Sequence, residues 1–433
     1  MAGDRAWGFR TRAIHAGGRP DPATGARAVP IYQTTSFVFE NAADAADLFA
    51  LQKYGNIYSR IGNPTVAAFE ERMASLEGGI GAVATASGQA AEFLTVSALC
   101  TTGDHLVSSA QLYGGTRTLL EGTVARFGIE TTFVADTDPT AFAAAVRPTT
   151  KLIHAEVVAN PSGAVADIAG LAEVARSAGI PLVVDSTVAT PYLCRPLDHG
   201  ADVVIHSATK FLGGHGTSLG GVIVDAGRFD WSNGNFPLMT APVPSYGGLS
   251  WWGNFAEYAF CTRLRAEQLR DLGPALSPFN AFLLLQGLET LAPRMDDHLA
   301  NTRAVAEFLA GHPGVAWVRW AGLTDHEHHE RARRYLPKGP GAVFAFGLRG
   351  GRAAGRTFIE SVELCSHLAN IGDVRTLVIH PASTTHQQLS DEALAAAGVP
   401  ADLVRISVGI EDPEEIIWDL DRAIHAATKA ADA

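Results

Sequence analysis

The sequence predicts an α/β protein with a mainly parallel central sheet and a smaller α/β domain at its C-terminal end. From Gly81 to Val224, short apolar runs of strand length alternate with longer stretches of helical periodicity. Strands that alternate with helices at this spacing form right-handed βαβ units, and such units build parallel sheets. A second set of strand and helix patterns follows Ser277 and predicts the smaller domain.

The composition is typical of a folded protein that works in water. Hydrophobic residues make up 47% of the 433 positions and charged residues 18%, which is too apolar for a disordered chain. A formal net charge of −12 argues against nucleic acid as a partner. The sequence contains neither an apolar N-terminal signal nor an apolar run of membrane-spanning length. We therefore expect a cytoplasmic protein that does not bind membranes.

The four cysteines lie far apart and form no CxxC pair: Cys100, Cys194, Cys261 and Cys365. This spacing predicts reduced, mostly buried thiols, as in other cytoplasmic proteins.

Residues 1–62 show little regular periodicity and many polar residues and glycines. The run from Asn41 to Leu51 fits a short helix, and the remainder predicts an extended arm. Such an arm must pack against another surface, and a neighbouring subunit is a common one. We therefore expect a homo-oligomer in which this arm contacts a partner subunit.

The first clear helix signal follows the arm. Asn63 is suited to the N-cap, Pro64 to the first helical position, and Gly78 with Gly79 to the end of the helix. Between them, one apolar stripe consists of Phe69, Met73 and Leu76.

The alternating region predicts a series of buried strands, at residues 81–84, 104–108, 130–134, 151–157, 181–184, 203–205 and 222–224. Ser87 and Asp167 are suited to start helices that end near Leu99 and Ala178. Ligands of parallel α/β sheets bind at the carboxyl ends of the strands. The polar residues that follow predicted strands are therefore candidates for a site: Ser87, Tyr113, Asn160, Asp185 and Lys210.

The rest of the chain predicts a loop rich in aromatic residues and proline over 229–252, then a long helix over 282–308 that is interrupted near Pro293. Further strands are expected at 315–318, 342–348 and 404–408. With a boundary near Ser277, we predict an arm (1–62), a larger domain (63–276) and a C-terminal domain (277–433).

Lys210 stands directly after a predicted buried strand, in the glycine-rich run 206–221. A lysine that is desolvated there would have a lowered pKa and could form a Schiff base with an aldehyde. The hydroxyls of Ser207 and Thr209 could hold a phosphate, and the glycines let the backbone approach a ligand. Pyridoxal phosphate combines these features. A glycine-rich surface hairpin with an exposed lysine explains the same run equally well.

Four other candidates fit such a cofactor or its substrate, although each also has an ordinary structural explanation. Asp185 could pair with a pyridinium nitrogen or cap a helix, and Tyr113 could cover a planar ring or pack in a loop. The helix start at residues 87–89 could bind phosphate, but helix starts are common. Arg405 could bind an α-carboxylate, whereas the sequence alone favours an arginine on the exposed face of an edge strand.

Two other patterns are not taken as sites. Residues 79–84 resemble a loose dinucleotide fingerprint but precede a strand rather than follow one. The run 325–330 is rich in histidine and acidic residues, but it lacks the HExxH spacing of a metal site and fits a solvated helix start. We predict no metal.

Taken together, these residues resemble the Cys/Met-metabolism family of pyridoxal-phosphate (PLP) enzymes, which has the type I, aspartate-aminotransferase-like fold. The resemblance covers nearly the whole chain, and the runs that carry it are 29–37, 58–65, 206–221, 273–282 and 377–386. It implies that residues 63–276 form a PLP-binding domain.

The resemblance implies a role for each matching residue. Lys210 would hold PLP covalently and move protons together with Tyr113, whose ring would stack on the cofactor. Asp185 would pair with the ring nitrogen, and Arg405, helped by Asn370, would bind the substrate α-carboxylate. The remaining cofactor contacts would come from Gly88, Gln89, Asn160, Ser207 and Thr209, and from Tyr58 and Arg60 of the partner subunit.

The implied reaction is a substitution at a γ-carbon, in which O-acetyl-L-homoserine and sulfide give L-homocysteine and acetate in methionine biosynthesis. Asn370-Ile-Gly-Asp stands where γ-synthases and lyases of the family usually carry Ser-Leu-Gly-Gly, which favours this reaction. A methionine γ-lyase reaction, a cystathionine γ-synthase reaction and O-succinylhomoserine as donor stay open, as does the physiological thiol. The family also implies a homotetramer with sites shared between subunits.

Overall fold

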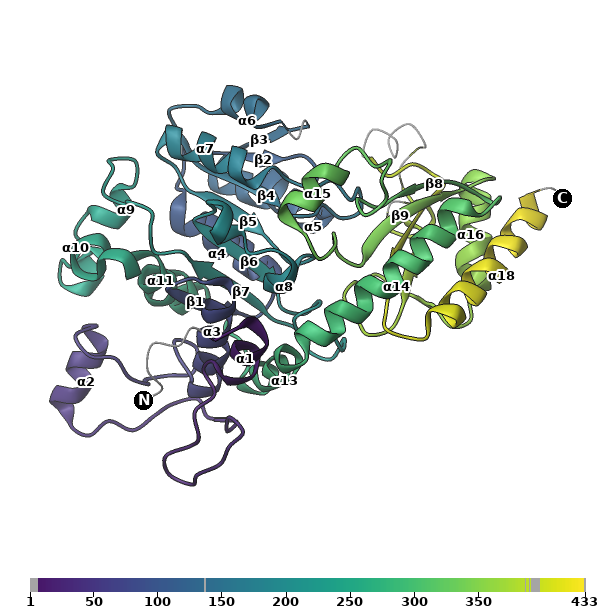
Figure 1. Cartoon of the computed structure of the whole chain (residues 1–433). Helices are drawn as coiled ribbons and strands as arrows, with labels where there is room; N and C mark the ends of the chain where they lie inside the picture. The colour runs from purple at the N-terminus through teal and green to yellow at the C-terminus, as the bar shows by residue number, and fades with distance from the viewer. Residues whose placement is uncertain (1–6, 136–137, 386, 389, 391–397, 432–433) are drawn as a thin grey trace.

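The computed structural model describes residues 7–431 apart from 136–137, 386, 389 and 391–397. It contains a seven-stranded and a five-stranded sheet. The long helix α14 (Leu291–Gly311) extends from the larger sheet toward the smaller one (Figure 1). The α/β class and the smaller C-terminal layer are thus confirmed, whereas the three domain ranges stay predictions. Within the predicted arm, residues 1–6 lie outside the described part.

The N-terminal segment is extended apart from two short helices. Helix α1 (Phe9–His15) contributes Ala13 to the large core. Helix α2 (Ala42–Phe49) begins after Asn41, whose side chain accepts a hydrogen bond from the Asp44 amide at 2.9 Å. This confirms the short helix that was predicted within the arm.

Helix α3 (Pro64–Glu77) follows the local signals that predicted it. The Asn63 side chain accepts a hydrogen bond from the Thr65 amide at 3.0 Å, and the helix ends where Gly78 adopts a left-handed conformation with φ 86°. The predicted apolar stripe is fully buried in the large core: Phe69, Met73 and Leu76.

The larger sheet contains every strand predicted for residues 81–224, with bounds that differ by at most two residues. The strands are β1 (Gly81–Thr85), β2 (His105–Ser109), β3 (Glu130–Val134), β4 (Thr150–Glu156), β5 (Leu182–Asp185), β6 (Val203–Ser207) and β7 (Gly221–Asp225). Their order is β1-β7-β6-β5-β4-β2-β3. β7 pairs antiparallel with β1 and β6, and the other pairs are parallel. The sheet is therefore mainly parallel, as predicted.

The helices between these strands carry the caps seen in the sequence. They are α4 (Gly88–Leu99), α5 (Gly114–Thr118), α6 (Pro139–Ala145), α7 (Ile168–Ala178) and α8 (Thr190–Leu193). Ser87 caps α4 and Asp167 caps α7, and both helices end where the sequence predicted. These helices lie close to the larger sheet in Figure 1.

Residues 229–252 form part of the core rather than a simple loop. Trp231 stacks on Phe260 with ring centroids 5.3 Å apart, and Phe236 meets Trp231 edge to face. Burial of these rings fixes the segment. The short helices of this region are α9 (Pro237–Thr240), α10 (Trp251–Phe255), α11 (Ala259–Arg263) and α12 (Arg270–Leu272).

The region predicted over 282–308 as one long helix or two is two helices, and the break lies near Pro293 as predicted, three residues before it. Helix α13 (Pro278–Glu289) ends at Thr290, and α14 starts at Leu291. Pro293 therefore lies in the first turn of α14. Proline is tolerated there because the first N–H groups of a helix have no intrahelical acceptor.

The smaller sheet is mostly antiparallel. Its strands are β8 (Val315–Arg319), β9 (Val343–Leu348), β10 (Ser366–His367), β11 (Leu377–Ile379) and β12 (Leu403–Ser407), in the order β10-β11-β12-β9-β8. The strands β10 and β11 were not predicted, because two or three residues are too short to show a period. The remaining helices are α15 (His329–Tyr335), α16 (Gly351–Ser361) and α18 (Pro413–Ala431).

Within the described residues, no helix combines the length and apolar character needed to cross a membrane. The four cysteines are free thiols, and three of them are buried while Cys261 is half-buried. Burial raises the pKa of each thiol above its ordinary value. The prediction of reduced, mostly buried thiols is confirmed.

Candidate active site

A cavity of about 210 Å³ lies at the carboxyl ends of β4, β5 and β6. Two of the predicted site residues, Tyr58 and Arg60, do not line it. The structure brings the others together here: Gly88, Gln89, Tyr113, Asn160, Asp185, Ser207, Thr209, Lys210, Asn370 and Arg405. The lining combines residues near the strands of the larger sheet with residues near the smaller sheet. Gly88 and Arg405, which are more than 300 positions apart, therefore line the same cavity.

Lys210 lies in the cavity, in the loop between β6 and β7. These strands do pair antiparallel, as a hairpin would, but the lysine is not exposed. Its Nζ donates a hydrogen bond to Asn370 Oδ1 at 2.5 Å. Burial, and secondly the positive charge of Arg405, lowers the pKa of Lys210 to about 8. The amine is therefore far easier to deprotonate than that of an exposed lysine.

The start of helix α4 forms one end of the cavity. Ser87 Oγ accepts a hydrogen bond from the Ala90 amide at 3.1 Å, and the other N–H groups of the first turn have no intrahelical acceptor. A methyl group on Gly88 would lie 2.6 Å from Ser207 Cβ, so the backbone approaches Ser207 closely. Gln89 Oε1 is buried with no hydrogen-bond partner among the described residues. The free N–H groups suit a phosphate, whereas Gln89 Oε1 can only accept a hydrogen bond.

Thr209 lies between Ser207 and Lys210 and closes the loop. Its hydroxyl accepts a hydrogen bond from the Gly220 amide at 3.1 Å and lies 3.2 Å from the Gly220 carbonyl oxygen. The loop between β6 and β7 is therefore held together just beside the lysine.

Asp185 ends β5 with its carboxylate in the cavity. Its Oδ1 accepts a hydrogen bond from the Thr187 amide at 2.7 Å. Burial, and secondly the negative charge of Glu92, raises the pKa of Asp185 to about 6. A cationic ring nitrogen beside this carboxylate would relieve that unfavourable burial of charge.

Tyr113 and Asn160 line the wall between the strand ends. Tyr113 is 50% exposed, and Asn160 Oδ1 is buried with no hydrogen-bond partner among the described residues. The free amide oxygen can accept a hydrogen bond from a ligand hydroxyl. The half-exposed ring can cover one face of a planar ligand.

Two carboxylates of the cavity were missed by the sequence analysis. Glu156 ends β4 beside Asp185 and accepts hydrogen bonds from the Tyr113 amide at 2.6 Å and the Asn160 amide at 3.3 Å. Burial raises its pKa well above the ordinary value. Glu92 of α4 pairs with buried His154 at 3.1 Å. Glu156 is a charged residue near the carboxyl end of the predicted strand 151–157, and that position could have revealed it, whereas Glu92 has no comparable signal.

Arg405 was expected on the exposed face of an edge strand, and this expectation was wrong. β12 lies inside the smaller sheet, between β11 and β9. Nη2 of Arg405 donates to the Asn370 carbonyl oxygen at 2.9 Å, and Nε is buried without a partner among the described residues. Burial lowers the pKa of Arg405 to about 10, which leaves it cationic at neutral pH. A free carboxylate is the matching ligand.

Tyr58 and Arg60 lie outside the cavity of their own chain. Both are exposed, and the Arg60 guanidinium lies 5.4 Å from the centre of the Tyr58 ring. Arg60 also donates to the Arg270 carbonyl oxygen. Their contribution to a neighbouring copy stays a prediction.

One cluster in the smaller layer has the composition of a metal site: His312, Asp421 and His425. The Gly314 amide donates to His312 Nδ1 at 3.0 Å, so the ring proton is on Nε2, which faces Asp421 at 3.1 Å. A metal ligand needs a free lone pair on that nitrogen. The hydrogen bonds therefore favour a structural contact, in which His312 Nε2 donates to Asp421 and joins the end of α14 to α18.

The run 325–330 was predicted to be a solvated helix start, and this is correct only in part. Helix α15 starts at His329, and Asp325, Glu327 and Glu330 are exposed. His328, however, is buried.

Comparison with known proteins agrees with this geometry. The family described as Cys/Met metabolism PLP-dependent enzyme matches residues 10–425. O-acetyl-L-homoserine sulfhydrylase from Leptospira meyeri is 49% identical over 96% of this chain and 96% of its own. Homocysteine synthase from Schizosaccharomyces pombe is 48% identical over 97% of this chain and 98% of its own.

A solved structure has the same fold. It is that of a Campylobacter jejuni protein assigned as an O-acetylhomoserine (thiol)-lyase, with a TM-score of 0.93 and 38% identity over 97% of this chain and 100% of its own. That crystal structure contains a pyridoxyl-lysine phosphate residue. The type I fold expected from the sequence is thereby confirmed.

Proposed function

The chain belongs to the Cys/Met-metabolism family of PLP-dependent enzymes, and from this premise we propose that it converts O-acetyl-L-homoserine and sulfide into L-homocysteine and acetate. One observation carries the proposal: a single cavity joins Lys210, Asp185 and Arg405. The relatives named O-acetyl-L-homoserine sulfhydrylase and homocysteine synthase match this chain over nearly its whole length.

The residues of the cavity fit PLP. Buried atoms without partners among the described residues, Asn160 Oδ1 and Gln89 Oε1, offer hydrogen bonds that the protein itself leaves unused. The start of α4, with Ser207 and Thr209, would hold the phosphate, and Asp185 would pair with the ring nitrogen. Lys210 would form the covalent link, and Tyr113 would cover the ring. When bound, PLP supplies an electron sink for bonds at the substrate α-carbon.

The chain's own residues bind the substrate and move its protons. Arg405 binds the α-carboxylate through its guanidinium, with Asn370 beside it. Lys210 Nζ, once free, takes the proton from the α-carbon, because its lowered pKa leaves a far larger neutral fraction at physiological pH than an ordinary lysine has. Lys210 and Tyr113 share the later proton transfers. Acetate leaves the γ-carbon, and hydrosulfide adds there.

The charges of the cavity favour an acetyl over a succinyl donor. Among the described residues that line the cavity, the cations are Lys210 and Arg405, and both have roles already. The other charged lining residues are the carboxylates Glu92, Glu156 and Asp185. A succinyl group would bring a second carboxylate into this surrounding at an electrostatic cost.

A paired assay tests the function. The purified protein, loaded with PLP, is incubated with O-acetylhomoserine with and without sulfide, and homocysteine and 2-oxobutyrate are measured. We expect homocysteine only when sulfide is present. Equal formation of 2-oxobutyrate without sulfide would identify a γ-lyase. Faster product formation from cysteine, or from O-succinylhomoserine, would identify a γ-synthase or the succinyl donor.

Arg405→Lys is expected to raise the KM for O-acetylhomoserine about 10- to 100-fold, with a small effect on kcat. A charge-assisted hydrogen bond contributes about 1.5–3 kcal/mol, and lysine cannot reproduce the two parallel bonds of the guanidinium. Steady-state kinetics with varied donor measures the change. Arg375→Lys is the control, because Arg375 is exposed and pairs with Asp373 outside the cavity. A KM equal to wild type would remove Arg405 from the binding site.

The rate of covalent PLP uptake by the cofactor-free protein is expected to rise with pH and to level off above about pH 8. Only a neutral amine attacks an aldehyde, and the pKa of Lys210 is lowered to about 8. At pH 7 about a tenth of the amine is then neutral, against less than about a thousandth for an ordinary lysine. Growth of the visible cofactor absorbance measures the rate. An inflection near the ordinary lysine pKa would contradict the desolvated site.

We also propose a homo-oligomer, built as a tetramer, in which Tyr58 and Arg60 complete the cavity of a neighbouring copy. Val38 is 99% exposed and Tyr54 is 90% exposed in the same arm, which supports a covering subunit. Light scattering gives the mass of the oligomer.

A mixing experiment tests the shared site. The variants Arg60→Ala and Lys210→Ala, each expected to be inactive alone, should regain activity when they are unfolded and refolded together, because some sites would then combine an intact Arg60 from one subunit with an intact Lys210 from the other. No recovery in a correctly assembled mixture would place Arg60 outside a shared site.

A further inference from the structure

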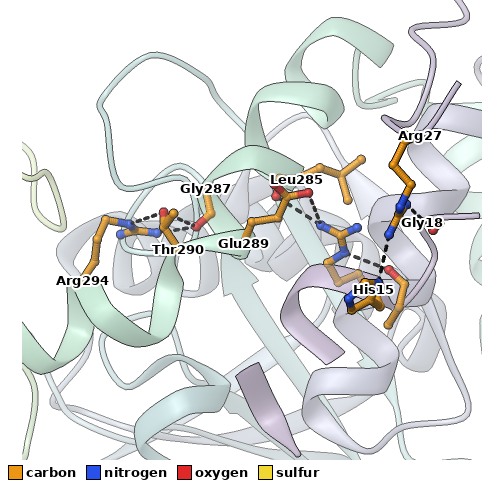
Figure 2. Close-up of polar contacts among 10 residues, drawn as sticks. His15, Gly18, Arg27, Leu285, Gly287, Glu289, Thr290 and Arg294 are labelled. Atoms are coloured by element: carbon orange, nitrogen blue, oxygen red, sulfur yellow. Dashed lines mark hydrogen bonds and ion pairs between the residues drawn. The ribbon is translucent and has the colours of Figure 1, made fainter. Parts of the chain in front are cut away.

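Two buried arginines hold the C-terminal end of helix α13. Arg72 of α3 donates to the Leu285 carbonyl oxygen at 3.3 Å and also to Ala16. Arg294 of α14 donates to the Gly287 carbonyl oxygen at 2.7 Å and contacts Thr290 (Figure 2). Both side chains are at most 5% exposed. They therefore add side-chain donors to carbonyl oxygens in the last two turns of the helix, where the Gly287 carbonyl oxygen also accepts from the Thr290 amide at 3.3 Å.

Only Arg294 also reaches the segment that carries Lys210. Its Nη1 donates to the Phe211 carbonyl oxygen at 2.9 Å, and its Nη2 to the Leu212 carbonyl oxygen at 3.3 Å. These are the two residues directly after the lysine. One guanidinium thus joins the Lys210 segment, the end of α13 and the start of α14.

The backbone around this contact is shaped to admit the guanidinium. Gly214 has φ +75°, and a methyl group there would lie 2.1 Å from Arg294 Nη1. Within the same turn, the Gly214 amide donates to the Lys210 carbonyl oxygen at 2.7 Å. The turn that begins at Lys210 is therefore closed by its own backbone and by Arg294.

The charge of Arg294 has no carboxylate partner in the described part of the chain. Burial lowers its pKa to about 10. Burying a cation that contacts only neutral oxygens is costly, so several acceptors have to satisfy its N–H groups at once. The planar guanidinium offers five donors in fixed directions, which a lysine cannot reproduce.

We propose that Arg294 is a positioning residue for Lys210: it fixes the backbone directly after the lysine and thereby places Nζ for the bond to the cofactor and for proton transfer. This inference rests on the proposed function, since it assumes that Lys210 holds PLP. Arg294 does not line the cavity, and it acts only through the backbone of Phe211 and Leu212.

The test compares Arg294→Lys with Arg72→Lys, a matched control. Both variants lose a buried guanidinium at the end of α13, but only one loses contacts to the Lys210 segment. We expect Arg294→Lys to lower kcat about 10- to 100-fold with the donor KM within about threefold, because a displacement of about 1 Å has effects of this size. It should also slow covalent PLP uptake by a similar factor. Arg72→Lys should change the melting temperature but neither kcat nor the uptake rate.

Gly287→Ala tests the same contact with the Arg294 side chain kept, in case Arg294→Lys fails to fold. A methyl group on Gly287 would lie 2.6 Å from the Leu212 carbonyl oxygen and 2.5 Å from that of Gly213, so it displaces the segment. We expect the same loss of kcat and of uptake rate. Circular dichroism and thermal melts confirm folding.

The outcomes separate this inference from the proposed function. If Arg294→Lys and Gly287→Ala load PLP as fast as wild type and keep its kcat, or if Arg72→Lys is impaired equally, the positioning role is wrong. If the wild-type protein itself takes up no PLP, or turns over no O-acetylhomoserine, the proposed function fails instead.

Discussion

Lys210→Ala is expected to lower the turnover of O-acetylhomoserine by about 10³-fold or more. The variant loses both the covalent link to the cofactor and the base that takes the α-proton, and each contribution is large. The Nζ group also anchors Asn370 at 2.5 Å, so the donor site loses one of its fixed contacts. Steady-state assays with sulfide and O-acetylhomoserine measure the loss.

A second readout separates a chemical from a structural failure in this variant. After borohydride reduction and dialysis, wild-type protein should retain the cofactor, whereas Lys210→Ala should release it. Circular dichroism should be unchanged, because alanine at this position removes no buried hydrophobic contact of the core. Near wild-type turnover in Lys210→Ala would refute the assignment of the whole site.

Asp185→Asn is expected to lower kcat about 100- to 1000-fold, with a smaller change in the donor KM. Breaking a buried pair of opposite charges costs about 3–5 kcal/mol, and the ring nitrogen would lose the charge that keeps it protonated. The variant should also bind PLP more weakly, which titration of the cofactor-free protein measures.

Asp202→Asn is the matched control for this experiment. Burial raises the pKa of Asp202 to about 6, as it does for Asp185, and Asp202 accepts a backbone hydrogen bond from Leu182 at 2.9 Å. Asp202 does not line the cavity. An equal loss of kcat in both variants would mean that the effect of Asp185 is one of folding rather than of cofactor chemistry.

The features that could be predicted from the sequence are those set by neighbouring residues. Ser87 and Asp167 cap α4 and α7 because a short polar side chain before a helix satisfies its first N–H groups wherever the helix lies. The strands of the larger sheet are mostly short apolar runs that alternate with helical stretches, which is the pattern of buried parallel strands. The cavity then follows from the rule that ligands bind at strand ends.

The features that could not be predicted depend on contacts between distant segments. Arg405 was expected at an edge because its strand gives no information about its neighbours. The order β11-β12-β9 shows that this strand lies inside the sheet, and Arg405 lines the cavity. Glu92 is one charge in an apolar helix, and its partner His154 lies 62 positions away. The contact of Arg294 with Phe211 spans 83 positions.

The two sheets contribute unequal parts of the cavity, and this has a consequence for how the protein is screened. Asp185 ends β5 and Lys210 follows β6 of the larger sheet, whereas Arg405 lies in β12 of the smaller sheet and Asn370 in the loop between β10 and β11. The yellow colour of bound cofactor therefore reports on the residues near the larger sheet. Only turnover also reports on the residues near the smaller sheet. A library that is sorted by yellow colour alone would accumulate variants with damage near the smaller sheet, and sorting by product would remove them.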